Sequence, residues 1–364
     1  MYLIITRNFP PELGGMQILM WGLSNSLAKH GIVKVFAEDH KDAVSHDKNV
    51  KYQIERIGGF KFFRKFRKAN LINEYLKENT SITTVIADHW KSLEKINSDL
   101  LKNKKTICLI HSKEINHPVN SNLNKRVLKT LSKTNYIVSN SNFTKKLAVN
   151  LNLNEEKIVV INPGVEKNIS PSKENILIAN ELFKNSFPKL ITVSRFDKRK
   201  NHEKIIMALR NLKQIYPNII YTCIGYGKEE ENIKTLVKEL NLDQQFLFFK
   251  GISQDLKNAL VSKSNLFVMP SIIYKKSVEG FGIAFVEAAQ YGISSIGGKD
   301  GGASDAIEDG KSGKICDGNN LDEIYSNINQ LLTNNSYLEF GKYAKSFVKK
   351  FEWEKIIEDY KKIL

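Results

Sequence analysis

Short runs of β-branched and other apolar residues alternate along the chain with longer runs in which apolar residues recur every three or four positions. The short runs predict buried strands and the longer runs predict amphipathic helices. In the first half, strands are expected at residues 3–6, 33–37, 84–87, 106–110, 136–139 and 158–161, and helices at 16–30, 62–78, 92–102, 122–133 and 142–150. Strands separated by helices are typical of right-handed βαβ units in a parallel sheet.

The alternation weakens after residue 165, where Pro171 and Pro188 interrupt it, and it restarts at Lys189. Strands are then expected at 190–193, 220–224, 246–249, 266–269 and 294–296, and helices at 202–214, 229–240, 254–262, 280–290, 320–332, 337–350 and 353–364. The length of 364 residues allows two domains, each with a core of its own.

The pattern therefore predicts an α/β protein with two doubly wound, Rossmann-like domains in series. The N-terminal domain is expected over residues 1–168, a linker over 169–188 and the C-terminal domain over 189–350. Ligands of open parallel sheets bind beyond the carboxyl ends of the strands. Two such sheets facing one another would enclose a cleft.

The net charge is +16, from 55 Lys and Arg against 39 Asp and Glu. The excess is uneven, because residues 1–180 carry +12 and residues 181–364 carry +4. Codon bias towards Lys explains a general excess, whereas an uneven one favours a partner, either an anionic membrane surface or nucleic acid. No nucleic-acid-binding motif accompanies the charge, which argues against nucleic acid.

The sequence contains no run of 18 apolar residues, so no transmembrane helix is expected. The N-terminus lacks the basic start and the cleavage site of a signal peptide. Cys108, Cys223 and Cys316 are odd in number and far apart, which favours reduced, buried thiols over disulfides or a zinc site. These features predict a cytoplasmic protein, with peripheral attachment to the inner face of the plasma membrane left open.

Glycine-rich and basic segments follow several of the predicted strands. Gly15 lies just before a helix, where free amides can bind phosphate or sugar oxygens, although a plain turn is the alternative. Arg195 and Lys200 lie five residues apart after the first strand of the second domain, where two cations can neutralise a diphosphate. The alternative is a solvated charged loop. Gly225 and Gly227 follow the next strand and either border a nucleotide or turn the chain.

The segment at residues 277–288 places two glutamates eight positions apart. Glu279 is expected at the N-terminus of a helix and Glu287 two turns inside it, within about 80° of each other on the helix surface. Both can then bind one ligand, with the amides of Phe281 and Gly282 on the same sugar. For Glu279, stabilisation of the helix dipole is the alternative.

His111 follows a strand of the first domain and is expected at its carboxyl edge, either in a ligand site or as a structural histidine. The sequence has no Asp-x-Asp pair, whose carboxylates would hold Mg²⁺ or Mn²⁺ on a diphosphate. It also has no P-loop and no HExxH or GxSxG motif. Cations and helix ends, without a metal or a cofactor, are expected to balance the charge of a diphosphate.

Residues 61–68 combine five cations with three phenylalanines. On a helix Phe62, Phe63 and Phe66 share one face, with the cations around it, which is the composition of a helix that lies in a membrane interface. The alternative is that the phenylalanines pack on the sheet and the cations are solvated.

Taken in order, these segments resemble the family 4 glycosyltransferases, which have the GT-B fold. The resemblance covers nearly the whole chain, in segments that begin at Phe9, Val160, Val193, Phe249, Leu266, Glu279, Glu287 and Ile307. Residues 277–288 and the Phe-Pro-Pro start are most similar to bacterial GDP-mannose-dependent mannosyltransferases that act on phosphatidylinositol mannosides. Asp197 and the Tyr291-Gly-Ile-Ser segment depart from the family pattern.

The resemblance implies a role for each candidate residue. Glu279 and Glu287 match the family's E-x7-E motif, so Glu279 would bind donor-sugar hydroxyls and Glu287 the ribose. Arg195 and Lys200 match the basic pair that holds the diphosphate. The remaining matches are Gly15 at the phosphate and the reacting sugar, His111 near the donor sugar, Phe281 and Gly282 on sugar oxygens, and Gly225, Gly227, Lys250 and Ile252 around the base.

The resemblance also implies the reaction. It is the retaining, metal-independent transfer of a hexose, with mannose as one candidate, from a GDP- or UDP-sugar. The acceptor would be a saccharide or a lipid-linked molecule in cell-envelope glycan or glycolipid synthesis, and residues 351–364 would return to the first domain. A nucleotide-sugar epimerase with the GT-B fold is the alternative enzyme, and a nucleic-acid-binding protein is the alternative outside enzymes.

Overall fold

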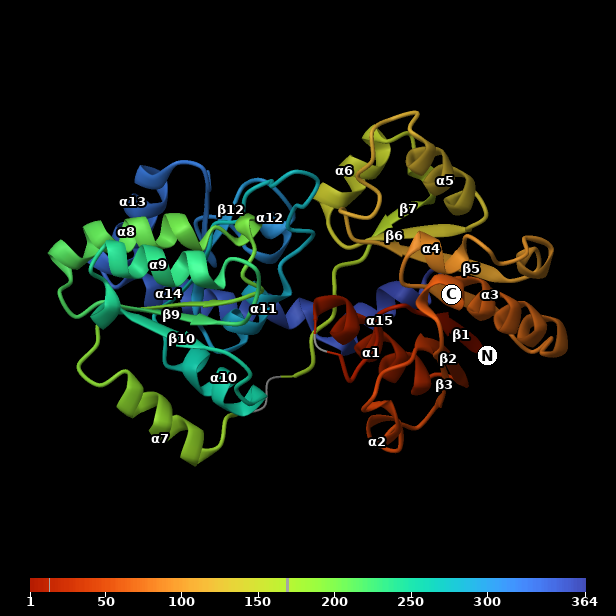
Figure 1. The fold of residues 1–364 in the computed structure, drawn as a ribbon, viewed down its shortest axis with the longest axis horizontal. Coiled ribbons are helices and arrows are strands. Elements are labelled where there is room, and N and C mark those ends of the chain that lie inside the picture. Colours follow the sequence, from red (N-terminus) through yellow and green to blue (C-terminus); the bar gives the residue numbers. More distant parts are fainter. Residues whose placement is uncertain (13, 168–169) are drawn as a thin grey trace. The chain divides into compact units, whose positions relative to one another are not determined.

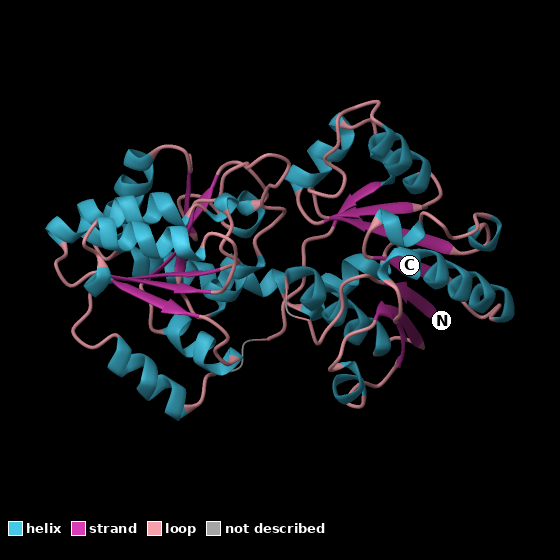
Figure 2. Cartoon of the chain, viewed as in Figure 1, coloured by secondary structure: helices cyan, strands magenta, loops and turns pink. Residues whose placement is uncertain are grey.

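The computed structural model describes residues 1–12, 14–167 and 170–364, and the chain divides into two compact units. The first unit holds Met1–Glu166 together with Phe351–Leu364, and the second holds Lys167–Lys350. Each unit contains a parallel sheet with helices on both faces (Figure 1, Figure 2). The domain boundary predicted at residues 168 and 169 lies outside the described residues.

The first unit is built on a sheet with the strand order β3-β2-β1-β4-β5-β6-β7, in which every pair is parallel. Its strands are β1 (Tyr2–Ile5), β2 (Val33–Glu38), β3 (Gln53–Ile57), β4 (Thr84–Ala87), β5 (Lys105–Ile110), β6 (Tyr136–Ser139) and β7 (Ile158–Val160). Its helices are α1 (Gly15–Ala28), α2 (Ala43–Asp47), α3 (Lys61–Glu78), α4 (Trp90–Leu93), α5 (Asn122–Leu131), α6 (Asn142–Asn150) and α15 (Trp353–Lys361), with short 3-10 turns at Asp99–Leu101 and Glu155–Lys157.

The second unit repeats this plan with the strand order β10-β9-β8-β11-β12-β13, again all parallel. Its strands are β8 (Lys189–Val193), β9 (Ile220–Ile224), β10 (Phe246–Phe249), β11 (Leu266–Met269), β12 (Ser294–Gly298) and β13 (Gly313–Cys316). Its helices are α7 (Lys173–Leu182), α8 (His202–Ile215), α9 (Glu230–Glu239), α10 (Gln254–Ser262), α11 (Ile283–Gln290), α12 (Ala303–Ala306), α13 (Leu321–Thr333) and α14 (Ser336–Phe347), with 3-10 turns at Lys198–Lys200 and Asp243–Gln245. A further 3-10 turn, Val348–Phe351, ends at the first residue of the C-terminal segment that belongs to the first unit.

Most predicted strands lie within a residue or two of their observed bounds, because the central strands are buried on both faces and read as apolar runs. The sequence missed β3 and β13, which are the edge strands of their sheets. In β3 only Ile57 is buried, and in β13 only Gly313 and Cys316 are buried. An edge strand of this kind gives almost no apolar signal. All three cysteines are buried, as predicted.

Two other predictions of secondary structure were wrong. Residues 169–188 are not simply a linker, because they contain α7, which packs against α10 and belongs to the second unit. The helix predicted at 92–102 is broken into α4 and the turn at Asp99–Leu101. The break follows from Asn97, whose side-chain oxygen accepts a hydrogen bond from the amide of Asp99 at 3.0 Å and so offers the backbone an alternative to the helix.

The C-terminal helix α15 returns to the first unit and packs against α1, as the blue and red ribbons show in Figure 1. The crossover is fixed by hydrogen bonds from the Val165 amide to the Phe351 carbonyl at 2.8 Å and from the Trp353 amide to the Val165 carbonyl at 3.2 Å. The Trp353 ring is buried against Gly22 of α1 and against Gly164. A Cβ atom at Gly22 would lie 2.0 Å from the Trp353 ring, and one at Gly164 would lie 2.4 Å from it.

This contact predicts that Gly22→Ala destabilises the protein by about 1–3 kcal/mol, through overpacking against Trp353. Helix propensity alone would make the same substitution stabilise the protein by about 1 kcal/mol. The sign of the change in the free energy of unfolding therefore separates the two effects. Urea unfolding measures this change in the free energy of unfolding, and Asn25→Ala, at a half-buried position on the same helix, is the control. A Gly22→Ala protein at least as stable as the wild type would contradict this packing.

Candidate functional site

The two basic residues predicted in the loop after β8 have different surroundings. Arg195 is exposed, and within the described part of the chain its guanidinium has no ion pair. Lys200 is only 8% exposed. Asn201, the next residue, is in a left-handed conformation (φ 62°), and its side-chain amide donates to the carbonyls of Pro270 and Gly318 at 3.0 and 2.7 Å. Arg195 therefore faces solvent, and Lys200 is buried.

The buried centre of the loop is an ion-pair cluster around Glu279. The Lys200 ammonium and the Arg199 guanidinium both donate to its Oε2 atom, at 2.5 and 2.6 Å. Burial alone would raise the pKa of Glu279, but the charges and hydrogen bonds of Lys200 and Arg199 lower this pKa to about 2. Glu279 is therefore ionised at neutral pH. Sequence reasoning missed Arg199, although its position next to Lys200 was a usable signal.

The predicted position of Glu279 on a helix was wrong. Its backbone pairs with Gly301 in an isolated bridge, and its carbonyl accepts the Gly302 amide at 2.8 Å. The helix α11 begins only at Ile283, after Gly282 in a left-handed conformation (φ 93°), where a Cβ atom would lie 2.5 Å from the Phe285 ring. Glu279 and Glu287 therefore do not share one helix face. The loop glycines Gly282 and Gly301 keep the backbone at Glu279 outside α11.

Glu287 lies inside α11 as predicted, half-exposed among buried apolar neighbours. Its Oε2 atom is 3.3 Å from the ammonium of Lys257 on α10. Phe281 is buried, so its side chain belongs to the core, and only its backbone could reach a ligand.

The glycines after β9 have a packing role. A Cβ atom at Gly225 would lie 1.9 Å from the carbonyl oxygen of Ser194, and one at Gly227 would lie 2.2 Å from that of Phe196. Because these positions stay free of side chains, the loop carrying Arg195 can lie directly against the loop after β9. In the next loop along the sheet, Lys250 is exposed and paired with Glu230 at 3.2 Å, and Ile252 is half-buried.

A series of buried hydrogen bonds supports the loop that carries Arg195. His202 Nε2 lies 3.0 Å from the hydroxyl of Ser194, and its Nδ1 lies 2.9 Å from the hydroxyl of Tyr221. Burial, and to a smaller extent the charge of Lys200, lowers the pKa of His202 to about 3. The neutral ring therefore fixes the residue that precedes Arg195. Sequence reasoning did not single out His202, because a histidine at the start of a helix carries no special signal.

In the first unit, the predicted residues lie at the carboxyl edge of the sheet. Gly15 is the exposed first residue of α1. His111 follows β5 and is half-buried, and its Nε2–H group donates to the carbonyl of Asp88 at 2.9 Å. This hydrogen bond requires a hydrogen on Nε2 and leaves Nδ1 as the other nitrogen of the ring.

Asp88 is a fully buried carboxylate that sequence reasoning missed, although it directly follows a predicted strand. It accepts hydrogen bonds from the Arg7 amide at 2.8 Å and from the Ser92 hydroxyl at 2.7 Å. Burial opposes its ionisation, but the nearby charge of Lys68 helps to keep its pKa below the usual value. Lys68 is 5% exposed and donates to the Thr6 carbonyl at 2.8 Å. The prediction that Lys68 is an interfacial or solvated cation was therefore wrong.

Over the ranges 1–12, 14–167 and 170–364, the structure shows no group of three or more His, Cys, Asp or Glu side chains placed to hold a metal ion.

The Glu279 cluster predicts a pH-dependent stability. Glu279→Gln should destabilise the protein by about 3–5 kcal/mol at pH 7, because it leaves two buried cations without their carboxylate. The folded-state pKa lies below the unfolded value, so the contribution of Glu279 is complete above about pH 4.5 and declines as the pH falls towards 2. Urea unfolding should therefore show that the difference in the free energy of unfolding between variant and wild type becomes smaller from pH 7 to pH 3. Glu239→Gln, an exposed position on α9, is the control, and a difference independent of pH would contradict the assignment.

Several known proteins are similar to this chain in sequence or in fold. Residues 13–168 match the sequence model described as Glycosyltransferase Family 4, and residues 173–347 match the one described as Glycosyl transferases group 1. A "GDP-mannose-dependent alpha-(1-6)-phosphatidylinositol monomannoside mannosyltransferase" of Mycolicibacterium smegmatis is 29% identical over 147 residues. The match covers 40% of this chain and only 38% of that protein.

A "GDP-mannose-dependent monoacylated alpha-(1-6)-phosphatidylinositol monomannoside mannosyltransferase" of Corynebacterium glutamicum is 22% identical over 344 residues, which are 91% of this chain and 88% of the relative. Among solved structures, HepE of Anabaena in complex with UDP has a TM-score of 0.83 at 16% identity and covers 99% of this chain and 98% of its own. Sucrose-phosphate synthase of Thermosynechococcus elongatus has a TM-score of 0.78 at 18% identity, with 100% and 97% covered.

The structural likenesses confirm the predicted GT-B fold. Because the two sequence models together match nearly the whole chain, the chain belongs to the family 4 glycosyltransferases.

Proposed function

We propose that this chain transfers a hexose from a nucleotide-diphosphate sugar to a saccharide or lipid-linked acceptor. The observation that carries the proposal is the loop at the carboxyl end of β8. There the exposed Arg195 and the Lys200–Glu279–Arg199 cluster concentrate positive charge at the edge of the sheet where ligands of parallel sheets bind. A pair of negatively charged phosphates fits this arrangement.

In the proposed donor complex, Arg195 binds the diphosphate directly, since its guanidinium is exposed and has no ion pair in the described part of the chain. Lys200 contributes its charge from a fixed position, held by Glu279. Glu287 accepts hydrogen bonds from the ribose, and the loops at Gly225–Gly227 and Lys250–Ile252 border the base. GDP-mannose is the donor we favour, on the names of the relatives from Mycolicibacterium and Corynebacterium. The UDP complex of HepE keeps UDP-sugars as the alternative.

For the chemical step we propose a retaining, front-face displacement without a metal. The bond between the anomeric carbon and the diphosphate oxygen breaks, and the acceptor oxygen forms a bond to the same face of that carbon. The acceptor proton passes to an oxygen of the departing diphosphate. Arg195 and Lys200 stabilise the negative charge that builds up on this leaving group. His111 and the amides at Gly15 belong to the first unit, which we assign to the acceptor and the reacting sugar.

This assignment predicts how Arg195→Ala changes nucleotide binding. The affinity for the nucleoside diphosphate that binds, UDP or GDP, should fall by roughly 10- to 100-fold, because hydrogen bonds to charged groups contribute about 1.5–3 kcal/mol. The affinity for the matching nucleoside, uridine or guanosine, should change little, since it has no diphosphate. Isothermal titration calorimetry measures both affinities.

The matched control is Arg210→Ala, an exposed arginine on α8 away from the strand-end loops. Its diphosphate affinity should equal that of the wild type. Equal diphosphate affinity in a folded Arg195→Ala protein would contradict the assignment.

We further propose that α3 attaches the protein to an anionic membrane surface. Phe62, Phe63 and Phe66 are 76%, 58% and 42% exposed, so the alternative that these rings pack on the sheet was wrong. Exposed aromatic rings surrounded by cations favour insertion at a membrane interface. In the part of the chain that the structure describes, no helix is long and apolar enough to cross a membrane.

This attachment predicts that replacing Phe62, Phe63 and Phe66 by serine weakens binding to vesicles of phosphatidylcholine with phosphatidylglycerol by roughly 10-fold or more, because each ring loses apolar burial. Vesicle co-sedimentation measures the partitioning. The control replaces three exposed apolar residues of the second unit by serine: Leu177, Ile215 and Leu338. If the two triple variants bind the vesicles equally, α3 is not the attachment site.

A further inference from the structure

A cavity of about 300 Å³ opens at the edge of the first unit's sheet, in a region that the donor assignment does not use. It lies beyond the carboxyl ends of three neighbouring strands, because Arg7 follows β1, Glu38 ends β2 and Lys91 follows β4. The remaining walls come from α3, from Arg126 on α5, and from α4 and the residues directly after it, which contribute Ser92, Glu94 and Lys95. This is the edge at which open parallel sheets bind ligands, and the volume is at the lower end of small-molecule sites.

The cavity lining is strongly positive. Seven cations line it against two carboxylates, an excess of five charges, or four when the buried Asp88 behind Lys68 is counted. The cations are Arg7, Arg64, Lys65, Lys68, Lys91, Lys95 and Arg126, and the carboxylates are Glu38 and Glu94. The first unit as a whole carries 29 basic and 19 acidic residues. The cavity therefore holds half of the unit's net excess of ten charges.

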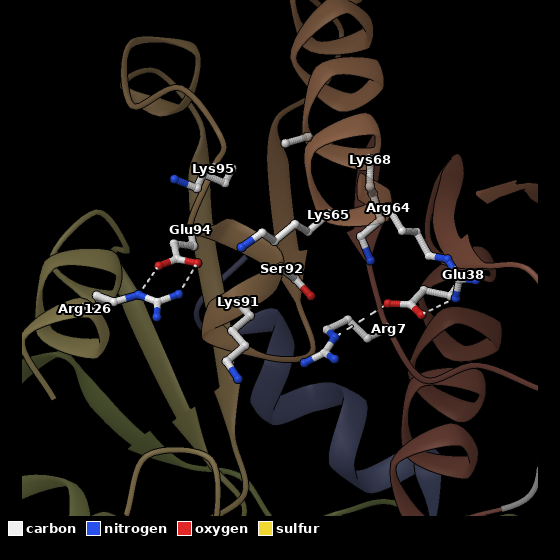
Figure 3. Close-up of a pocket in the computed structure, with 11 residues that line it drawn as sticks. Arg7, Glu38, Arg64, Lys65, Lys68, Lys91, Ser92, Glu94, Lys95 and Arg126 are labelled. Atoms are coloured by element: carbon white, nitrogen blue, oxygen red, sulfur yellow. Dashed lines mark hydrogen bonds and ion pairs between the residues drawn. The ribbon is translucent and has the colours of Figure 1, made fainter. Parts of the chain in front are cut away.

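The two carboxylates are already engaged in the walls. Glu94 accepts two hydrogen bonds from the Arg126 guanidinium, at 2.6 and 2.9 Å. Glu38 is paired with Arg64 at 2.9 Å and lies 3.6 Å from Arg7. Figure 3 shows these pairs on opposite sides of the cavity. These pairs hold the guanidinium groups of Arg64 and Arg126 in the walls of the cavity.

Three lysines remain unneutralised in the cavity. Within the described part of the chain, Lys65, Lys91 and Lys95 have no carboxylate within 4.0 Å. Figure 3 shows Lys65 and Lys91 extending into the space between the Glu38 and Glu94 pairs. Burial and then the charges of Arg7 and Arg126 lower the pKa of Lys91. Unpaired cations held together in this way are stabilised by an anion placed among them.

We infer that this cavity binds a phosphate group of the acceptor, as a phosphomonoester or phosphodiester. The inference rests on the proposed transferase function and names the acceptor class that the first unit takes. The ammonium group of lysine and the guanidinium group of arginine are the partners that phosphate oxygens prefer. The cavity is larger than a phosphate needs, so part of the attached molecule enters with it.

The position of the cavity on α3 connects it to the membrane surface. Lys65 lies 4.8 Å from the centre of the exposed Phe66 ring, and Lys95 lies 5.5 Å from the same ring. The helix thus carries its phenylalanines directly beside the cations that line the cavity. A phospholipid headgroup, or a phosphate that links a sugar to a lipid, would reach the cavity from a membrane on which α3 rests. A soluble sugar phosphate would reach it from solution.

The test removes two of the three unpaired lysines and keeps the ion pairs. Lys65→Gln with Lys91→Gln should fold normally, since neither side chain has an ion pair in the described part of the chain. The matched control is Lys129→Gln with Lys146→Gln, two exposed lysines of the first unit outside the cavity, which remove the same charge. Calorimetric titration with sn-glycerol 3-phosphate and with inorganic phosphate tests the soluble source. Phosphatidylcholine vesicles with and without phosphatidylglycerol test the lipid source.

The expected result is binding to glycerol phosphate or to the phosphatidylglycerol vesicles that falls by roughly 10-fold or more in the cavity variant and is unchanged in the control. A loss confined to one arm identifies the source of the phosphate. Equal losses in both variants, or no phosphate-dependent binding in either arm, would overturn the inference. Titration with UDP and GDP distinguishes this failure from failure of the proposed function, because nucleotide binding belongs to the second unit and should be unaffected by the cavity variant.

Discussion

The site of the second unit depends on one buried carboxylate. Glu279 neutralises Lys200 and Arg199 in a region where a lone ammonium would be unstable, so the protein can keep a cation at the end of β8 without solvating it. The bridge between Glu279 and Gly301 and the left-handed conformation of Gly282 keep that carboxylate outside α11. Because Arg199 and Lys200 satisfy the buried carboxylate, the exposed Arg195 has no ion pair in the described part of the chain, and we propose that it binds the diphosphate.

The sequence predicted the sheets better than the site. Buried central strands such as β4 and β11 read as continuous apolar runs, and the order of motifs indicated the family. The edge strands β3 and β13 gave no such signal. Periodicity also placed Glu279 on a helix, because no local rule reports that Gly282 is left-handed. Arg199 and Asp88 were missed for a related reason, because their hydrogen-bond partners lie 80 to 82 residues away in the chain. Arg199 binds Glu279, and Asp88 binds Thr6 and Asn8.

The uneven charge has a structural explanation in the first unit. Lys68 supports the buried Asp88, and Arg64 and Arg126 are held by glutamates. In the described part of the chain, Lys65, Lys91 and Lys95 line the cavity without a carboxylate within 4.0 Å. The helix that supplies several of these cations also exposes Phe62 and Phe63. A basic excess that composition alone could assign to codon bias thus includes structural residues, and we propose that the others bind a membrane surface and a phosphate of the acceptor.

The most direct measurement of donor use is the thermal stability of the wild-type protein with a panel of UDP-, GDP- and ADP-sugars. A ligand that binds only the folded state stabilises it by about 2.7 kcal/mol at 100 times its dissociation constant. A nucleotide-sugar-dependent transferase should be stabilised by sugars of one nucleotide class, GDP-mannose first, and hardly by the others. The absence of a shift with every nucleotide sugar at millimolar concentration would contradict the proposed donor site and the function built on it.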